Sequence, residues 1–312
     1  MYGIQRTIRA VEGYRETAKH GGAPTNRIQT STDAEILRTA EDKLTELRSI
    51  LKPMGCALVA YSGGVDSAFL LKVAVDELGA QALAVTADSP TIPRAELEAA
   101  IQLAHQLGAR HLVVSTDEMA NPAFTTNNAD RCYHCKSILF STLSKVARER
   151  GIDFVLEGSN QSDLNDYRPG MKAAERFQVR SPLREARLTK DEIRLLSRQT
   201  GLRVWDKPAA PCLSSRIPYG SQITLERLQR IEVAEAFIRQ LGFKVLRVRD
   251  HDTVARIEVP LSDMTKLFDL DVASQIQDKL KSLGFRYVTI DLGGFRSGSM
   301  NEVLGKATDG PR

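Results

Sequence analysis

The sequence predicts an α/β protein with a doubly wound parallel sheet, followed by a smaller α+β domain. Two observations support this prediction. Short apolar runs alternate with segments of helical periodicity through the first part of the chain, and a glycine-rich turn joins the first apolar run to a helix. Such alternation is typical of a parallel sheet with helices on both faces. The alternation changes after Trp205, which predicts the second domain.

Each element follows from the spacing of apolar residues. An amphipathic helix is expected from Ala34 to Leu51, where apolar residues recur at helical spacing. Short apolar runs predict buried strands over 57–61, 82–86, 111–115 and 154–157. Helices are expected over 68–78, 94–107 and 137–150. For the second domain we expect helices over 226–241 and 271–283, paired strands over 244–249 and 253–259, and a strand over 287–291.

The expected organisation has three parts. Residues 1–31 form a polar, basic extension, residues 32–205 form the nucleotide-binding α/β domain, and residues 206–312 form a C-terminal α+β domain for substrate binding or oligomerisation. The linker is placed near Asp206-Lys207-Pro208, where the alternation of strands and helices ends.

Composition narrows the class of protein. Apolar residues make up 42% and charged residues 26%, as in soluble globular proteins. The net charge of +4 fits an enzyme with anionic ligands better than a dedicated nucleic-acid binder. No apolar run approaches the ~20 residues that cross a membrane, and no apolar signal core begins the chain. Four cysteines are too few for a disulfide scaffold, so a cytoplasmic location is expected.

The segment Ser62–Ser67, with the sequence SGGVDS, lies between a predicted buried strand and a predicted helix. Glycines let the backbone approach a phosphate closely, and a helix N-terminus offers N–H groups to an anion. The lysine of a GxxxxGK[ST] loop is absent, which favours cleavage at the α-phosphate of ATP. The alternative is a glycine-rich turn without a ligand. The residues expected to hold the ATP phosphates and Mg²⁺ are Ser62, Gly63, Gly64, Asp66 and Ser67.

This loop resembles that of the PP-loop ATP-pyrophosphatases, whose signature is SGGxDS. The resemblance implies the fold of the adenine nucleotide alpha hydrolases and a reaction that activates an oxygen as an adenylate and expels pyrophosphate. The superfamily includes GMP and NAD synthetases, asparagine synthetases, argininosuccinate synthetase and tRNA-thiolating enzymes. The loop alone does not choose among them.

Three cysteines suggest sulfur or metal chemistry. Cys132 and Cys135 form a CxxC pair just before a predicted helix, and Cys212 lies further along the chain. One interpretation is three thiolates that hold an iron–sulfur cluster with one iron left open. The alternatives are a zinc site completed by His134, a redox pair, and plain thiols. Cys56, before the first strand, is expected to be a small core residue.

Several longer motifs resemble the LarE family of sulfur transferases, which make the pincer cofactor of lactate racemase. The resemblance covers about residues 34 to 305. The motifs are Glu157-Gly-Ser-Asn160, Asn165-Asp-Tyr-Arg-Pro-Gly170, Ser214-Ser-Arg-Ile-Pro-Tyr-Gly220, Arg247-Val-Arg249, Ala255-Arg-Ile-Glu258 and Asp291-Leu-Gly-Gly-Phe-Arg-Ser-Gly298.

The resemblance implies a substrate, pyridinium-3,5-biscarboxylic acid mononucleotide, whose carboxylates are adenylated by ATP and then thiolated. In the family a serine and two arginines hold the substrate phosphate, and the matching positions are Ser215, Arg247 and Arg249. Two arginines separated by one residue on a strand point to the same face and suit a phosphate better than lysines. Ordinary surface arginines are the alternative.

Further roles are expected by the same resemblance. Glu235 and Glu258 match carboxylates near a metal or substrate, although both fit ordinary surface charges equally well. Lys136 is expected to neutralise the α-phosphate, and Gly158 is assigned to the cofactor-binding set. A homo-oligomer, specifically a hexamer, and a small-molecule substrate without nucleic acid are also implied.

Two sulfur sources occur in the family: a single sacrificial cysteine, or three cysteines that hold a 4Fe-4S cluster. Because Cys132, Cys135 and Cys212 are all present, the chain resembles the second type. The sacrificial cysteine of the first type would fall at or beside Cys212. The other functions considered are a tRNA thiolase, a non-catalytic ATP or redox sensor, and an amide-forming synthetase. The cluster hypothesis requires the three thiols to converge beside the nucleotide turn.

Overall fold

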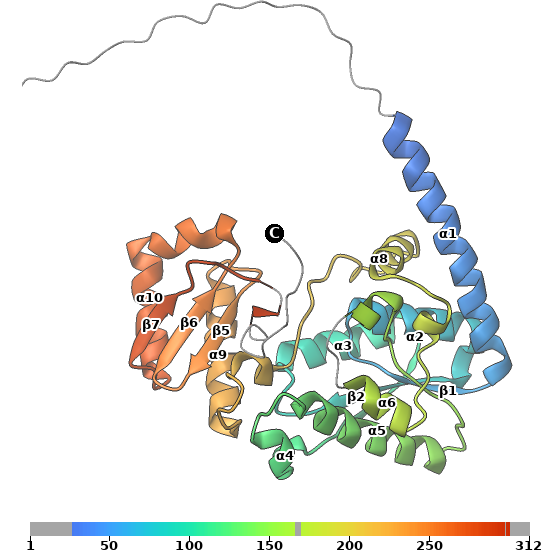
Figure 1. The fold of residues 1–312 in the computed structure, drawn as a ribbon, viewed down its shortest axis with the longest axis horizontal. Coiled ribbons are helices and arrows are strands. Elements are labelled where there is room, and N and C mark those ends of the chain that lie inside the picture. The colour runs from blue at the N-terminus through green and yellow to red at the C-terminus, as the bar shows by residue number, and fades with distance from the viewer. Residues whose placement is uncertain (1–26, 166–169, 297, 300–312) are drawn as a thin grey trace, which may run out of the picture.

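Two sheets organise the structure, a computed structural model that describes residues 27–165, 170–296 and 298–299 (Figure 1). The first sheet has four parallel strands in the order β3-β2-β1-β4. Ligands of such sheets bind at the carboxyl ends of the strands, where the strand order reverses. In this sheet, that point lies between β1 and β4. The strands are β1 (Ala57–Ala60), β2 (Ala82–Asp88), β3 (Arg110–Ser115) and β4 (Val155–Leu156).

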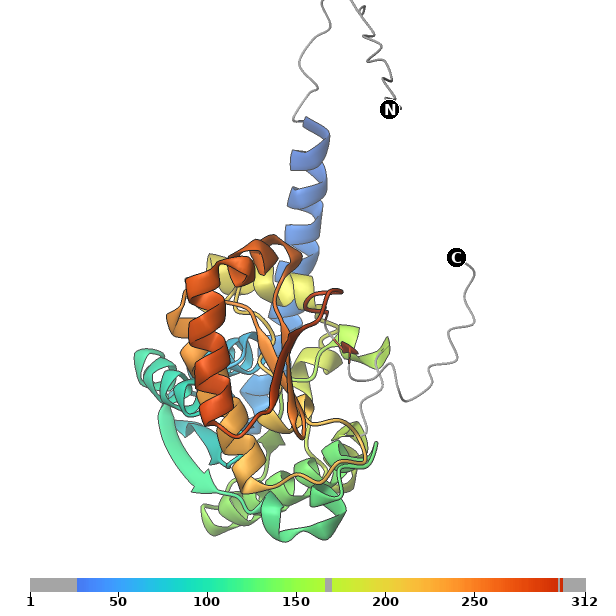
Figure 2. The ribbon, with the colours of Figure 1, turned by 90° about the vertical axis from the view of Figure 1, so that its left-hand side faces the viewer.

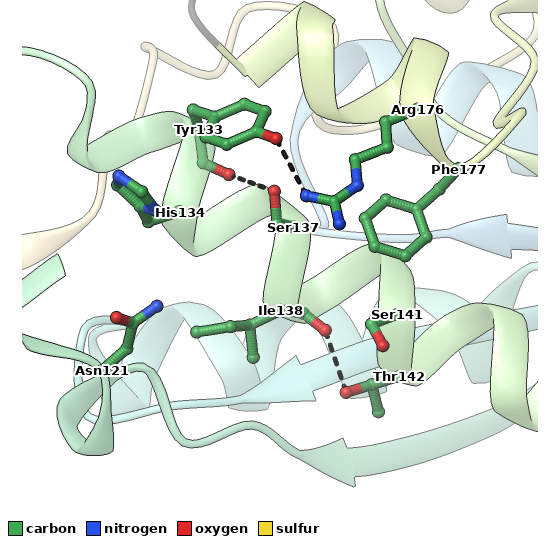
Figure 3. A pocket seen from close by; sticks show the side chains of 9 residues that line it. All are labelled: Asn121, Tyr133, His134, Ser137, Ile138, Ser141, Thr142, Arg176 and Phe177. Atoms are coloured by element: carbon green, nitrogen blue, oxygen red, sulfur yellow. Dashed lines mark hydrogen bonds between the residues drawn. The ribbon is translucent and has the colours of Figure 1, made fainter. Parts of the chain in front are cut away.

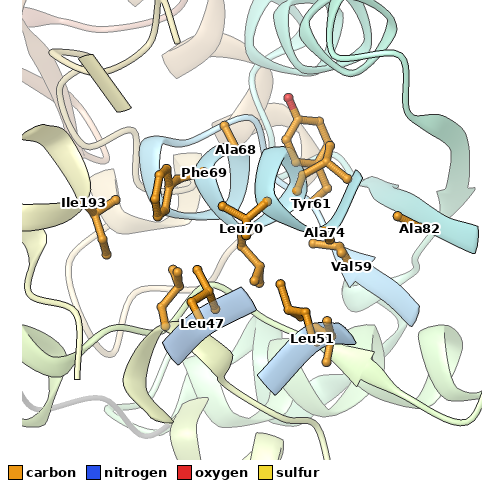
Figure 4. Packing of buried hydrophobic residues seen from close by; sticks show 14 of the residues in the cluster. Leu47, Leu51, Val59, Tyr61, Ala68, Phe69, Leu70, Ala74, Ala82 and Ile193 are labelled. Carbon is orange, nitrogen blue, oxygen red and sulfur yellow. The ribbon is translucent and has the colours of Figure 1, made fainter. Parts of the chain in front are cut away.

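Helices cover both faces of this sheet because successive strand residues point to opposite sides. Val59 of β1 packs in the cluster shown in Figure 4, whereas Leu58 packs in a second cluster on the other face. The helices on the Val59 face are α1 (Arg27–Leu51), α2 (Val65–Leu78), α3 (Arg94–Gln106), α7 (Pro182–Glu185) and α8 (Lys190–Gln199). Those on the Leu58 face are α5 (Arg131–Glu149) and α6 (Gly170–Arg176).

The second sheet has the order β5-β6-β7, with β5 antiparallel and β7 parallel to β6. Two helices pack on one of its faces (Figure 2). The core between them and the sheet includes Val248 and Ile257. The elements are α9 (Leu225–Gln240), β5 (Arg247–His251), β6 (Val254–Glu258), α10 (Leu270–Ser282) and β7 (Tyr287–Ile290). The predicted fold class, a parallel α/β sheet followed by a smaller α+β unit, is therefore confirmed.

A small apolar cluster joins the two parts. It brings Phe124 of α4 (Pro122–Thr125) against side chains that precede and begin α9. The other buried members are Leu213, Ile217, Ile223, Leu228 and Ile231. Because Cys135 packs at the edge of this cluster, the interface lies beside the cysteine pair. Short 3₁₀ segments complete the described elements: Lys52–Met54, Gly79–Gln81, Glu118–Ala120, Gln161–Asn165, Leu213–Arg216 and Leu261–Phe268.

Three expectations about the elements need correction. Helix α5 begins at Arg131 rather than at Ser137, so the CxxC pair lies within its first two turns and not before it. Helix α1 begins at Arg27, seven residues before the predicted start. Helix α8 was not predicted, although Thr189 and Glu192 form a capping box at its start.

Some sequence predictions concern residues outside the described ranges. Most of the N-terminal extension (residues 1–26) lies outside them, as do residues 166–169 and 297 within two of the family motifs. The predicted domain limits at 31 and 205 stay predictions. In the described part of the chain, no helix is both long and apolar enough to cross a membrane.

Candidate active site

The nucleotide loop lies where β1 ends and α2 begins. Ser67 ties the loop together: its hydroxyl accepts a hydrogen bond from the backbone N–H of Ser62 (3.2 Å) and donates one to the carbonyl of Gly64 (3.1 Å). Gly64 is the N-cap of α2, and no side chain caps this helix. An uncapped helix N-terminus offers N–H groups and a positive dipole end to an anion. The loop therefore has the geometry of a phosphate site.

Close packing explains two glycines at this loop. Gly63 has a φ of +71°, and a Cβ atom there would lie 2.7 Å from the Cβ of Ala100 on α3. A Cβ atom on Gly158, in the loop after β4, would lie 3.0 Å from the backbone N of Ser67. Both glycines thus let neighbouring segments press against the loop. For Gly158 this is a packing role, and its predicted role in cofactor binding stays a prediction.

The three cysteines singled out by sequence come near one another. Burial raises the pKa of the Cys135 thiol, and the neighbouring thiol of Cys212 and the carboxylate of Glu118 raise it further. Desolvation and the thiol of Cys212 also raise the pKa of Cys132, against the opposing charges of Arg131 and Lys136. Cys135 packs against the apolar cluster that contains Leu213, the residue after Cys212, so the Cys212 segment lies beside the CxxC pair although it is far from it in sequence.

Asn127 holds the Cys212 segment beside α5. This asparagine is fully buried with a φ of +61°, and its Nδ2 donates to the carbonyl oxygens of Pro218 (2.7 Å) and Ser221 (2.9 Å). Leu213 anchors the same segment from the other end, donating its backbone N–H to the carbonyl of Thr91 (2.7 Å). Asn127 is not among the site residues that the sequence predicts. Its Asn-Asn pair before a helix is a turn signal that could have drawn attention to it.

Lys136 lies between the thiols and the nucleotide loop. It follows Cys135 on α5, and its Nζ is 3.4 Å from Oε2 of Glu157, the residue before Gly158. Burial raises the pKa of Glu157, but Lys136, Ser159 and Ser181 lower it more, so its pKa is below the usual value. The carboxylate is therefore ionised at neutral pH and holds the Lys136 ammonium near the loop.

The thiols do not form a finished metal site. Within residues 27–165, 170–296 and 298–299, no group of three or more His, Cys, Asp or Glu side chains is placed to hold a metal ion. Cys132 is exposed, whereas Cys135 and Cys212 are half-buried. His134, the alternative fourth zinc ligand, lies 3.2 Å from Asp130 instead. The donor chemistry of three neighbouring thiols suits a three-thiolate site, and metal binding by them stays a prediction.

A second anion-binding candidate is formed by β5 and the segment before α9. Arg247 and Arg249 share the face of the second sheet that is turned away from α9 and α10. Nη1 of Arg249 donates to the carbonyl of Ser215 (2.9 Å), so two members of the predicted phosphate site are in contact. Arg247 donates to the carbonyl of Ala209 (2.9 Å) in the linker. Both arginines are buried rather than on the surface.

Positive charge is concentrated here. Burial, followed by the guanidinium of Arg216, lowers the pKa of Arg247 to about 10, against the opposing influence of Glu235. The Arg247 guanidinium stays charged at neutral pH. An additional anion beside it would stabilise this charge. Buried arginines at this density suit a phosphate ligand.

Glu235 and Glu258 bind arginines in the structure. Oε1 of Glu235 accepts from Nε of Arg216 (2.9 Å), and Oε2 of Glu258 accepts from Nη2 of Arg249 (2.6 Å). Both carboxylates are fully buried. They therefore position the guanidinium groups, and a metal ion would have to compete with these ion pairs. The metal role predicted for the two glutamates stays a prediction.

A separate surface pocket of about 460 Å³ lies along α5, beside the end of α6 (Figure 3). The Tyr133 hydroxyl accepts a hydrogen bond from Nη1 of Arg176 (3.0 Å) across its rim. No cysteine lines it. The lining residues are Asn121, Tyr133, His134, Ser137, Ile138, Ser141, Thr142, Arg176 and Phe177.

Comparison with known proteins decides the family. The chain is 39% identical to the pyridinium-3,5-bisthiocarboxylic acid mononucleotide synthase of Lactiplantibacillus plantarum, across 87% of this chain and 98% of that protein. The chain belongs to the LarE family. An uncharacterized protein from Synechocystis sp. is 48% identical across 85% of this LarE-family chain and 99% of its own length.

More distant similarity places the family in its superfamily. A GMP synthase from Aeropyrum pernix is 27% identical over 64% of the present chain, which corresponds to 43% of that enzyme. Together with the parallel sheet and the SGGVDS loop, this agrees with the PP-loop fold. No model of a protein family matches the chain.

Proposed function

We propose that this LarE-family chain is an ATP-dependent sulfur transferase acting on pyridinium-3,5-biscarboxylic acid mononucleotide. A substrate carboxylate attacks the α-phosphorus of ATP, and pyrophosphate leaves. Sulfide then attacks the acyl carbon, so that a C–S bond forms and the C–O bond to AMP breaks. A second round on the other carboxylate gives the dithio product named in the L. plantarum relative.

The observation that carries the proposal is the placement of Lys136. It follows the half-buried Cys135 and reaches Glu157. Glu157 precedes Gly158, which packs against Ser67 of the nucleotide loop. A lysine at this point can stabilise charge on the α-phosphate while a sulfur atom approaches from the cysteine side. We assign ATP and Mg²⁺ to the loop, with Asp66 in the first turn of α2 as the Mg²⁺ carboxylate.

The arginine face supports the choice of a mononucleotide. Ser215 and Arg249 are in contact, and Arg247 lies on the same face of β5. A substrate that carries one phosphate and two carboxylates would place its phosphate here and its reacting carboxylate toward the cysteines. The phosphate would replace the carbonyl groups that the arginines bind in this structure, and each replacement exchanges a neutral acceptor for an anionic one.

For the sulfur source we propose a 4Fe-4S cluster bound by Cys132, Cys135 and Cys212. The fit rests on the donor chemistry of three thiols, and on the cluster that brings Cys135 and Leu213, the residue after Cys212, together at the junction of the two parts of the molecule. When bound, such a cluster supplies sulfide at the iron that no thiolate occupies. Burial raises the pKa of Cys132 and of Cys135, so both thiols are protonated at neutral pH and would lose their protons when the cluster binds.

We also propose that the protein acts as a cytoplasmic homo-oligomer. Large apolar side chains are exposed on the C-terminal part of the molecule, and exposed apolar surface of this kind is typical of protein contacts. They are Leu261, Phe268, Leu270, Tyr287 and Leu292.

The test is anaerobic purification followed by iron and sulfide analysis, with pyrophosphate release and thiocarboxylate formation followed by mass spectrometry. Cys132→Ala and Cys212→Ala should lose the bound iron and repeated turnover. Cys56→Ala is the matched control, because this half-buried cysteine lies outside the trio, with its Sγ 3.9 Å from the carbonyl of Gly151.

Three results would change the proposal. A metal-free wild type that yields one product per chain and dehydroalanine at Cys212 would make that residue the sacrificial donor. Thiolated nucleosides formed from tRNA would replace the proposed substrate. Pyrophosphate release at the same rate with and without the biscarboxylate substrate would exclude the proposed adenylation and sulfur transfer.

A further inference from the structure

Lys207 reaches the nucleotide loop from the linker between the two parts of the chain. Its Nζ lies 3.3 Å from the carbonyl oxygen of Gly63 and 2.7 Å from Oε2 of Glu96, in the first turn of α3. Its backbone is anchored as well: the N–H bonds to the carbonyl of Val204, and the carbonyl accepts from Nη2 of Arg194 (3.3 Å). The ammonium is therefore held at the loop by contacts on both its side chain and its backbone.

The loop itself supplies no cation. Between Ser62 and Ser67 the one charged residue is Asp66, so charge compensation for a triphosphate must come from Mg²⁺ and from other parts of the chain. Two lysines are placed to provide it. Lys136 approaches from α5, on the Leu58 face of the sheet, and Lys207 approaches beside α3, on the Val59 face.

The positions of Lys136 and Lys207 indicate where the two ends of the triphosphate lie. Sulfur must meet the adenylated carboxyl, so the α-phosphate has to lie toward Lys136 and the adjacent Cys135. The leaving pyrophosphate departs in line, away from the attacking oxygen. The Lys207 ammonium at Gly63 lies beside α3, on the opposite face of the sheet from α5. It is therefore on the side toward which the pyrophosphate leaves.

We propose that Lys207 binds the β- and γ-phosphates of ATP and the leaving pyrophosphate. This inference rests on the proposed function, since it assigns a residue to the same nucleotide site. The exchange is favourable because Nζ gives up a neutral carbonyl at 3.3 Å for an anionic oxygen. Glu96 keeps the ammonium in place before the nucleotide arrives.

The experiment is isothermal titration of the full-length protein with inorganic pyrophosphate, ATP·Mg and AMP, without the pyridinium substrate. Lys207→Met should weaken pyrophosphate and ATP binding by about tenfold or more, as expected for one lost charge-assisted hydrogen bond. AMP binding should change by less than about twofold, because AMP carries the α-phosphate alone. Lys207→Arg, which keeps the charge, should recover most of the pyrophosphate affinity.

Lys43→Met is the matched control. Lys43 forms an ion pair with Glu192 at the same Nζ–O distance of 2.7 Å, and its side chain is similarly exposed (26% against 21% for Lys207). Its ion pair joins α1 to α8 and does not involve the nucleotide loop, so this variant should bind all three ligands as the wild type does. Thermal unfolding of both variants shows whether either substitution acts through the fold.

The outcomes separate this inference from the proposed function. Unchanged pyrophosphate affinity in Lys207→Met, or equal losses for AMP and pyrophosphate, would overturn the role of Lys207 and leave the sulfur transferase proposal standing. A wild type that binds neither ATP nor pyrophosphate would overturn both. A wild type that binds pyrophosphate through Lys207 but forms no thiocarboxylate would overturn the proposed function alone.

Discussion

The nucleotide loop and the arginine face of the second sheet are both suited to anions, but they are constructed in different ways. The loop uses backbone N–H groups and a helix N-terminus within the consecutive residues Ser62–Ser67. The arginine face uses buried guanidinium groups on β5. Glu258 on β6 binds Arg249, whereas Arg247 donates to backbone carbonyl groups and has Glu235 on α9 as a nearby counter-charge.

This difference determines how each site can fail. Backbone donors cannot be removed by changing a side chain, so the loop is sensitive to anything that alters its path. Buried ion pairs tolerate few single changes, because removal of one partner leaves an uncompensated charge in the interior. The loop should therefore respond to added volume, and the arginine face to lost charge.

The largest expected effect is from Glu258→Ala. Glu258 accepts from Arg249, Arg256 and Ser299, and its removal leaves Arg249 buried without a counter-charge. The free energy of unfolding should fall by about 3–5 kcal/mol, measured by urea denaturation. The control is Glu185→Ala, which removes the carboxylate that pairs with Arg180. Glu185 is more exposed than Glu258, so its loss should cost at most about 1 kcal/mol. Equal losses in the two variants would contradict the claim that burial sets the difference.

Gly63→Ala tests the loop and should have the next largest effect. The new Cβ would meet α3 at 2.7 Å in a backbone with positive φ, so we expect a loss of about 2–4 kcal/mol and of ATP binding. Gly108→Ala is the control, since Gly108 has a similar φ of +68° with no atom within 4 Å of the added Cβ. Its cost should be about 1–2 kcal/mol, with ATP binding intact. The difference between the variants, measured by unfolding and titration calorimetry, isolates the contact with Ala100.

The smallest effect is the change of stability with pH. Burial raises the pKa of Glu235, but Arg216, Arg239 and Arg247 outweigh it and the pKa is lower than usual. Its stabilising contribution is therefore complete above the unfolded pKa of about 4.3 and is lost as the pH falls through the folded value. The stability difference between wild type and Glu235→Gln should be constant from pH 7 to 5 and narrow below about pH 4. A difference that stays constant in acid would show that Glu235 is not ionised in the fold.

The sequence predicted most elements because apolar periodicity reports which faces are buried. Its errors are local. The start of α5 was placed at Ser137 because the polar residues of its first turns, including Arg131 and His134, interrupt the apolar pattern. Arg131 is nevertheless buried, since its guanidinium lies over the ring of Tyr219, 4.5 Å from the centroid. A contact with a residue so distant in the chain cannot be read from local spacing.

By itself, the sequence determined the fold class, the nucleotide loop and the family, because each depends on a short pattern or on overall similarity. Only the tertiary structure showed that Cys212 lies near Cys132 and Cys135, that Glu258 holds Arg249, and that Lys207 reaches Gly63. The physical reason is that these are contacts between segments far apart in the chain. Their partners are chosen by sheet pairing and by the packing of whole helices, not by the residues next to them.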